Sequence, residues 1–280
     1  MMTFSERMRR RMAVWWEDRS LGVRVHRFRE RARQRRGGEP DEAWRCCEAW
    51  PRQLIAKQNG RVFAARHGLR VPTLHWRGRL PARIPWDALP DDVVVKSSTG
   101  SGARGTFVVA GGRELNSGTG MTRDELQRAV LETHGRVCRY PLLVEDFVLE
   151  AGAKPVLPVE YRCFTFGRTV AFIEVMHRVR HEDVLHACYS PDWQRHEEDF
   201  RTGFIMADPE PAPPHLAEML AACHRLGPLL GTFMRLDFYM GRDGPVFGEF
   251  SSTPRRGLRF SDKGERVLGA LWEEHFPERT

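Results

Sequence analysis

The sequence lacks any run of about 18 apolar residues, and its N-terminus lacks the apolar stretch of a secretory signal peptide. It also has no CxxC pair, and its six cysteines are not spaced with histidines as zinc ligands are. These absences argue against a membrane-spanning protein, a disulfide-linked secreted domain and a zinc module. We therefore expect a cytoplasmic protein with reduced cysteines.

Outside the N-terminal segment, the sequence has no excess of positive charge. The net charge is +7, but residues 1–38 contain twelve arginines and four acidic residues, a net charge of +8. The rest of the chain therefore has a net charge of −1. Nucleic-acid binding needs positive charge on the surface that binds, so we expect no nucleic-acid partner.

What is present suits a globular unit divided around a cleft, with 41% hydrophobic and 29% charged residues among 280. In the N-terminal segment, Phe4, Met8, Met12 and Trp15 recur at helical spacing between arginines, which predicts a basic amphipathic helix. Such a helix suits peripheral contact with an anionic membrane. Alternatively, its apolar face packs on the rest of the protein.

Secondary-structure signals follow this segment. Thr122 and Glu125 form a capping-box pattern at a helix start, and Gly227 and Pro228 lie near the expected end of another helix. The predicted helices cover residues 41–67, 122–133 and 211–230, and the predicted strands cover residues 93–95, 106–110, 142–148, 161–166, 169–175, 234–239 and 246–250.

A glycine-rich loop, GSGARG at residues 100–105, separates two of these strands. A Rossmann loop opens a helix and a Walker A loop continues with GK[ST], and this loop does neither. In a protein kinase the loop precedes the lysine strand, whereas Lys96 precedes this loop. The order predicts a lid whose backbone amides close on phosphates that Lys96 also contacts. The alternative is an ordinary hairpin with a solvated lysine. The lid residues expected to approach the nucleotide are Ser98, Gly100, Gly102 and Gly105.

Two acidic residues lie on the last two predicted strands. Asp237 and Glu249 each interrupt an apolar run, and a turn at residues 241–244 joins the runs. Buried carboxylates need a positive partner, and Mg²⁺ binds carboxylates together with phosphates. We predict a magnesium site at this pair. The alternative is that Arg235 or Arg162 satisfies both carboxylates.

The segment LLVEDFVLE, residues 142–150, is an apolar strand that gains acids at its end. Backbone groups from Glu145 to Phe147 are expected to recognise adenine, and the carboxylate of Glu145 or of Glu150 is expected to bind the ribose hydroxyls. The alternative is a strand that ends in solvated charges.

The order of these segments resembles the ATP-grasp superfamily, and in particular the TupA-like family associated with teichuronopeptide and polysaccharide biosynthesis. The resemblance spans about residues 54–272. It begins with LIAKQNGRVFAARHGLRVPTL, similar to the family's opening lysine helix, and continues with VVVKSSTGSGARGTFVV, LLVEDFV, VEYRCFTFGRTVAFIEVMHR, RLDFY and FGEFSSTP.

The resemblance implies an α+β ATP-grasp fold with two α+β lobes whose antiparallel sheets clasp ATP. The expected parts are an Arg-rich amphipathic helical segment (1–38), a helical region before the grasp (39–90), a lid lobe (91–145) and a C-terminal lobe with the metal site (146–280).

Residue roles also follow from the resemblance. Lys57 and Lys96 are expected to bind phosphate oxygens, and Arg162 and Arg235 are expected to stabilise the transferring group. The metal ligands implied are Asp237, Glu249 and Ser251. Many family ligases have Asn where this chain has Ser251, so one firmly held Mg²⁺ is expected.

The resemblance implies an ATP- and Mg²⁺-dependent ligase that joins a carboxylate to an amine through an acyl phosphate. Arg178, Arg255 and Arg256 are candidates to hold an acidic substrate, because a guanidinium fork fits a carboxylate; each could equally be an ordinary surface arginine. Two other functions are open: phosphate transfer without ligation, and a membrane-tethered adaptor with a vestigial nucleotide site.

Overall fold

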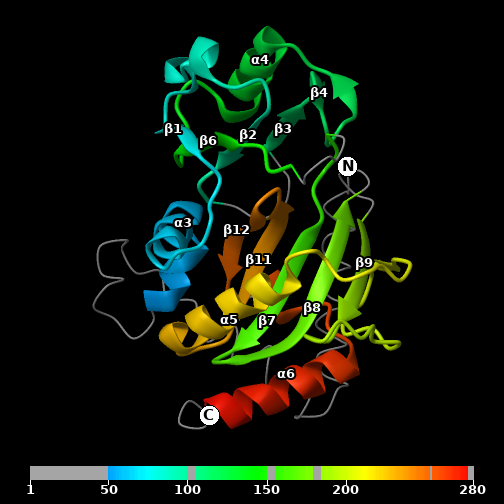
Figure 1. The fold of residues 1–280 in the computed structure, drawn as a ribbon. Coiled ribbons are helices and arrows are strands. Elements are labelled where there is room, and N and C mark those ends of the chain that lie inside the picture. The colour runs from blue at the N-terminus through cyan, green and yellow to red at the C-terminus, as the bar shows by residue number, and fades with distance from the viewer. Residues whose placement is uncertain (1–49, 100–104, 150–154, 179–183, 253, 277–280) are drawn as a thin grey trace, which may run out of the picture.

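Two six-stranded sheets form the framework of the protein (Figure 1). The computed structural model describes residues 50–99, 105–149, 155–178, 184–252 and 254–276, so the predictions for residues 1–38 lie outside this part. Strand pairs in both sheets are antiparallel, with one parallel exception at the edge of the second sheet. The predicted α+β architecture is confirmed. In the described part of the chain, no helix has the length and apolar character to cross a membrane.

The first sheet has the strand order β1-β6-β2-β3-β4-β5. β1 belongs to the segment 39–90, and its pairing with β6 extends the sheet of the lid lobe back to residue 74. The strands are β1 (Leu74–Gly78), β2 (Val93–Ser97), β3 (Phe107–Ala110), β4 (Arg113–Glu114), β5 (Thr119–Gly120) and β6 (Leu142–Asp146).

Helix α4 (Arg123–His134) and two 3-10 turns, η3 (Pro81–Arg83) and η4 (Trp86–Ala88), cover this sheet. Leu126 and Val130 of α4 pack against Val93 and Val95 of β2. The predicted capping box is confirmed, because the side chain of Thr122 accepts from the backbone of Glu125 and the side chain of Glu125 accepts from the backbone of Thr122.

The second sheet has the order β10-β9-β8-β7-β11-β12. Its strands are β7 (Glu160–Phe166), β8 (Thr169–Arg178), β9 (Val184–Tyr189), β10 (Ile205–Met206), β11 (Met234–Gly241) and β12 (Gly244–Ser251). The four strands predicted in this region are confirmed, whereas β9 and β10 had not been predicted from the sequence.

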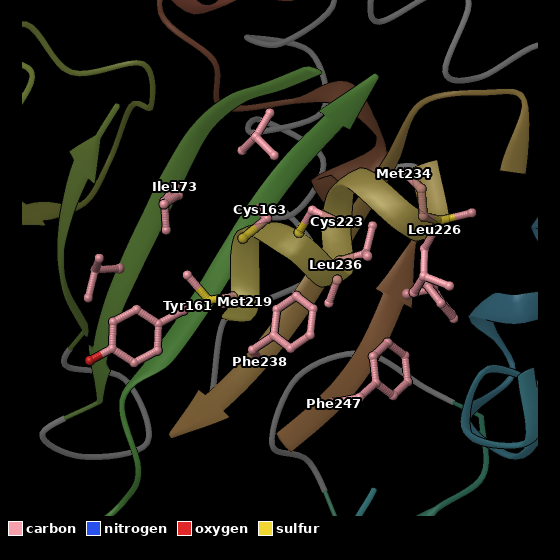
Figure 2. Close-up of a cluster of buried hydrophobic side chains, with 14 of the residues drawn as sticks. Tyr161, Cys163, Ile173, Met219, Cys223, Leu226, Met234, Leu236, Phe238 and Phe247 are labelled. Atoms are coloured by element: carbon pink, nitrogen blue, oxygen red, sulfur yellow. The ribbon is translucent and has the colours of Figure 1, made fainter. Parts of the chain in front are cut away.

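Two helices pack on opposite faces of this sheet. α5 (Leu216–Leu230) covers Tyr161 and Cys163 of β7, and Figure 2 shows these side chains meeting those of the helix. α6 (Asp262–His275) covers Phe164 and Phe166 on the other face. Since side chains alternate along a strand, Arg162 shares the face of Phe164, in the part of that face where polar residues gather.

Helix α5 begins at Leu216 and continues through Pro228 to Leu230, with Gly231 in a left-handed conformation at its end. Gly227 therefore does not end the helix. A Cβ atom at this position would lie 1.7 Å from the carbonyl oxygen of Gly167, so the glycine permits the close approach of α5 to the turn between β7 and β8.

Between the two sheets lies α3 (Lys57–Arg66), which follows the 3-10 helix η2 (Trp50–Ile55). The helix packs on β12 through Phe63, whose ring meets that of Phe250. At its first residue, the backbone N–H of Lys57 donates to the carbonyl oxygen of Ser98 at 3.0 Å, directly after β2. α3 is thus fixed to both sheets, next to β12 in Figure 1.

Candidate nucleotide and metal site

Two carboxylates face each other on neighbouring strands of the second sheet. Asp237 of β11 is the register partner of Glu249 on β12, and a bulge at Gly248 follows. Both lie on the face opposite α5, because the adjacent residues Leu236 and Phe238 pack in the core beneath that helix. The strand pairing predicted from the sequence is therefore confirmed.

Each carboxylate is in contact with positive side chains. Arg235 donates from Nε to Oδ1 of Asp237 at 2.7 Å, and Nε of Arg162 lies 3.9 Å from Oδ2 of Asp237. Nζ of Lys57 lies 2.6 Å from Oε2 of Glu249, and Arg235 also lies 3.5 Å from Oε1 of Glu249. The structure therefore contains the arginine contacts that the alternative to a metal site requires.

The two carboxylates differ in how well these contacts compensate for burial. Burial raises the pKa of Asp237 to about 6, although Arg235 and Arg162 act in the opposite direction. Burial also acts to raise the pKa of Glu249, but Lys57 and Arg235 outweigh it and lower the value to about 2. Asp237 is thus a buried carboxylate whose charge its neighbours do not fully offset.

The donor set fits Mg²⁺. It consists of hard oxygen ligands, namely the carboxylates of Asp237 and Glu249 and the hydroxyl of Ser251, the residue paired with Arg235 across the two strands. Mg²⁺ binds through one or two carboxylates and completes its shell with phosphate oxygens and water. A divalent cation would also stabilise the charge of Asp237, whose burial Arg235 and Arg162 do not fully offset.

A cavity lies next to this pair, between the two sheets. Nζ of Lys96 is 2.6 Å from Oε2 of Glu145, and NH1 of Arg61 is 3.4 Å from Oε1 of the same carboxylate. Three cationic side chains and one carboxylate thus meet at one small cavity. The cavity is lined by Lys57, Arg61, Val71, Pro72, Lys96, Glu145, Phe247 and Gly248.

The expected adenine hinge lies on β6 and directly after it. The side chain of Glu145 is 5% exposed and its carboxylate contacts Lys96 in the cavity. The side chain of Phe147 is buried and packs with Val108 and Ala110. Glu150, the other candidate for the ribose, lies outside the described residues.

The lid residues flank the end of β2. Ser98 is buried, and its backbone N–H donates to the carbonyl oxygen of Pro141 at 2.8 Å. Gly105 adopts a φ of 68°, and its carbonyl oxygen lies 2.8 Å from Nε2 of His134. The predicted lid positions Gly100 and Gly102 lie outside the described residues.

Arg162 is the centre of an ion network on β7. Its Nε donates to Oε2 of Glu160 at 3.0 Å, and its NH1 lies 3.5 Å from Oε2 of Glu174. Arg178, at the end of β8, contacts Oε1 of Glu160 at 3.4 Å. These contacts place Arg162 and Arg178, both predicted site residues, in one ion network. The network lies on the same face of the sheet as Asp237.

The network follows a single row across the sheet. Register pairs connect Glu249 to Asp237, Asp237 to Arg162, Arg162 to Glu174, and Glu174 to Cys188. Neighbouring side chains of a row on one face lie within contact distance. Arg162 is therefore held between a carboxylate of the candidate metal site and a fully buried carboxylate, Glu174.

At the far end of this row, His186, Cys188 and Asp199 form a group of metal-ligand type. Nε2 of His186 lies 2.6 Å from Oδ2 of Asp199, and its Nδ1 lies 3.7 Å from Glu174. Burial acts to lower the pKa of His186, but these carboxylates raise it to about 9. Arg201 adds a cation 3.0 Å from Glu174. The charges balance within the cluster itself, so it is interpreted as structural.

The remaining candidates for an acidic substrate lie at the end of β12. Arg255 and Arg256 belong to a 3-10 turn, η5 (Pro254–Gly257), and their side chains lie outside what the structure describes.

Three residues of the site were missed from the sequence: Arg61, Glu160 and Glu174. Arg61 follows Lys57 by four residues, which places both on one helix face. Glu160 precedes Arg162 by two residues on one strand, so both side chains point to the same face. These two spacings were available in the sequence, whereas the contact with Glu174 depends on the pairing of β7 with β8.

The chain is similar to a known family in sequence and to solved structures in fold. A model of the family described as TupA-like ATPgrasp matches residues 52–273. The solved structure of D-alanine–D-alanine ligase from Bacillus anthracis, complexed with ATP, is similar with a TM-score of 0.51 and 14% identity, over 82% of this chain and 68% of that one. No curated protein matches the chain.

Two further solved structures are similar with TM-scores below 0.5. D-Alanine–D-alanine ligase from Helicobacter pylori has a TM-score of 0.46 and 17% identity, over 78% of this chain and 61% of that one. A RimK domain ATP-grasp protein from Sphaerobacter thermophilus has a TM-score of 0.47 and 17% identity, over 80% and 70% of the two chains. At such identities, similarity to solved structures concerns the fold alone.

Proposed function

Since this chain belongs to the TupA-like ATP-grasp family, we propose that it is an ATP-dependent ligase that joins a carboxylate to an amine through an acyl phosphate. The observation that supports this most is the carboxylate pair Asp237 and Glu249 beside a cavity lined by Lys57 and Lys96. The two sheets thus bring these carboxylates and lysines to one place.

In the proposed reaction, a carboxylate oxygen of the first substrate attacks the γ-phosphorus of ATP, and the bond to the oxygen of the departing ADP breaks. The products of this step are an acyl phosphate and ADP. The amine of the second substrate then attacks the acyl carbon, the bond from that carbon to the phosphate oxygen breaks, and the amine nitrogen loses a proton. Inorganic phosphate and an amide are released.

The protein would bind and orient the reactants. Asp237 and Glu249, with Ser251, would hold Mg²⁺, which when bound neutralises phosphate charge. Lys57 and Lys96 would donate to phosphate oxygens. The lid residues Ser98, Gly100, Gly102 and Gly105 would exclude water from the acyl phosphate, which hydrolyses readily.

Arg162 and Arg235 would stabilise charge on the transferring phosphoryl group, because their guanidinium groups already lie beside Asp237. Backbone groups from Glu145 to Phe147 would contact adenine, and Glu150 is a further candidate for the ribose.

We further propose that the first substrate is acidic and that the pathway makes a polysaccharide, a cell-envelope component or a natural product in the cytoplasm. Arg178, which contacts Glu160 in the network of Arg162, is the described candidate to hold that substrate. Arg255 and Arg256 are additional candidates on sequence grounds. The basic residues 1–38 would allow reversible contact with an anionic membrane.

Condensation assays test this proposal. The full chain is incubated with ATP, Mg²⁺ and pools of amino acids and acidic sugars, while ADP and product masses are measured. A product whose mass equals both substrates minus water, formed together with ADP, supports ligation. A phosphorylated product without amine incorporation would instead support a phosphotransferase, and no nucleotide turnover with any pool would contradict both.

A further inference from the structure

Arg61 is the cation of the cavity that the proposed function does not use. It lies on α3 one helical turn after Lys57, its side chain is 15% exposed, and it lines the same cavity as Lys57 and Lys96. Its NH1 approaches Oε1 of Glu145 at 3.4 Å, the long end of the range for a hydrogen bond.

The other cations of this cavity have closer partners. Lys96 lies 2.6 Å from Glu145, and Lys57 lies 2.6 Å from Glu249. Glu145 therefore carries one negative charge between two cations, Lys96 and Arg61. Within the described residues, the cavity has one more cation than these two close ion pairs neutralise.

A guanidinium that is mostly buried is costly unless an anion compensates its charge. Arg61 also presents a planar fork of N–H donors, which matches the oxygens of a phosphate better than a single carboxylate oxygen at long range does. The position is rigid, because α3 packs on β12 through Phe63 and Phe250 and its first N–H is held by Ser98.

We propose that Arg61 is a further phosphate-binding residue, which exchanges its long contact with Glu145 for phosphate oxygens of the nucleotide. This inference rests on the proposed function, since it assumes that the cavity accepts a nucleoside di- or triphosphate. It adds a residue from α3 that ties nucleotide binding to the helix between the two sheets.

Calorimetric titration of the full chain with MgATP, MgADP and adenosine tests the proposal. Arg61→Ala is expected to weaken MgATP and MgADP binding about tenfold, which corresponds to about 1.4 kcal/mol. Adenosine binding should change less than twofold, because adenosine has no phosphate. Arg61→Lys should lie between Arg61→Ala and wild type, since lysine keeps the charge but lacks the fork.

Arg66→Ala is the matched control, because Arg66 lies on the same helix but is exposed. It should leave all three affinities unchanged. A thermal unfolding curve for each variant shows whether the fold is intact, and Arg61→Lys keeps the test valid should Arg61→Ala fail to fold.

A second measurement uses inorganic tripolyphosphate, which has no adenine or ribose. Glu145→Gln removes the carboxylate that competes for Arg61, so tripolyphosphate should bind this variant several-fold more tightly than wild type. Adding Arg61→Ala to Glu145→Gln should weaken that binding again. If Arg61→Ala does not change tripolyphosphate binding in the Glu145→Gln variant, Arg61 does not exchange Glu145 for phosphate, and the proposal is overturned.

The outcomes separate this inference from the proposed function. If wild-type protein and Arg61→Ala bind MgATP equally tightly, the phosphate-binding role of Arg61 is wrong, whereas the proposed function is not affected. A lower melting temperature of Arg61→Ala with unchanged affinities has the same consequence, because Arg61 then only ties α3 to the first sheet. Wild-type protein that binds no adenine nucleotide overturns both.

Discussion

Replacement of Asp237 is predicted to have opposite effects on stability and on activity. Burial raises the pKa of this carboxyl from 3.8 to about 6, against the attraction of Arg235 and Arg162. A shift of about two pKa units corresponds to about 3 kcal/mol, because each unit is worth about 1.4 kcal/mol. Asp237→Asn, which mimics the neutral form, should therefore raise the free energy of unfolding by about 3 kcal/mol at pH 8 in the absence of Mg²⁺.

The pH dependence has a defined sign. A carboxyl whose pKa is raised in the folded state binds its proton more tightly there, so its stabilisation is complete below pH 3.8 and is lost as the pH rises through about 6. Wild-type protein should lose stability over this window relative to Asp237→Asn. The advantage of the variant should thus be large at pH 8 and almost absent near pH 4.

Urea unfolding of the full chain at pH 4.5 and pH 8 measures these differences, and ADP release with Mg²⁺ measures activity. Asp237→Asn should abolish ATP turnover while it stabilises the fold, and Mg²⁺ should stabilise wild type more than the variant. Asp243→Asn is the control, since Asp243 lies exposed in the turn between β11 and β12.

Two results would refute this reasoning. An Asp237→Asn variant that is less stable than wild type at pH 8 would show that Arg235 and Arg162 fully compensate the buried charge. ATP turnover near the wild-type rate in the same variant would remove Asp237 from the metal site.

Three further variants complete the predictions. Glu249→Gln should abolish turnover but lower stability, because Lys57 and Arg235 outweigh burial and lower the pKa of Glu249 to about 2; urea unfolding at pH 8 measures the loss, and increased stability would contradict it. Glu174→Gln should reduce kcat at least about tenfold with little change in the Kd of ATP, since Glu174 positions Arg162; unchanged kcat would limit Glu174 to a structural role. His186→Gln should remove a pH dependence. Carboxylates outweigh burial and raise the pKa of His186 from 6.5 to about 9, so wild type should lose about 3 kcal/mol of stability as the pH rises through this window. Equal pH profiles of the two proteins in urea unfolding would refute that assignment.

Local signals in the sequence predicted much of the fold. The capping box of Thr122 and Glu125 and the strands around the glycine loop depend on residues a few positions apart, which a sequence displays directly. The pairing of Asp237 with Glu249 was predictable for the same reason, because a short turn joins their strands.

Elements and contacts that depend on distant residues were not predicted. β9 contains His186, Ala187 and Cys188 in place of a β-branched run, and it becomes a strand because β8 lies beside it. α6 begins at a local signal, the cap at Ser261, although this helix was not predicted from the sequence. Likewise, neither the contact of Lys57 with Glu249 nor that of Lys96 with Glu145 follows from spacing, since the partners are far apart in the chain.

The ion pair of Lys57 with Glu249 has a consequence for the affinity of the site. These two side chains neutralise each other at 2.6 Å, so a phosphate on Lys57 and a metal ion on Glu249 would together have to replace this ion pair. A phosphate would bind Lys57 while a cation would bind Glu249, so the charges of both side chains stay balanced only if both ligands bind. Either ligand alone would separate a half-buried ion pair and leave one partner without compensation, which is costly. The arrangement therefore favours joint binding of ATP and Mg²⁺, and ATP affinity should fall sharply when Mg²⁺ is removed by a chelator.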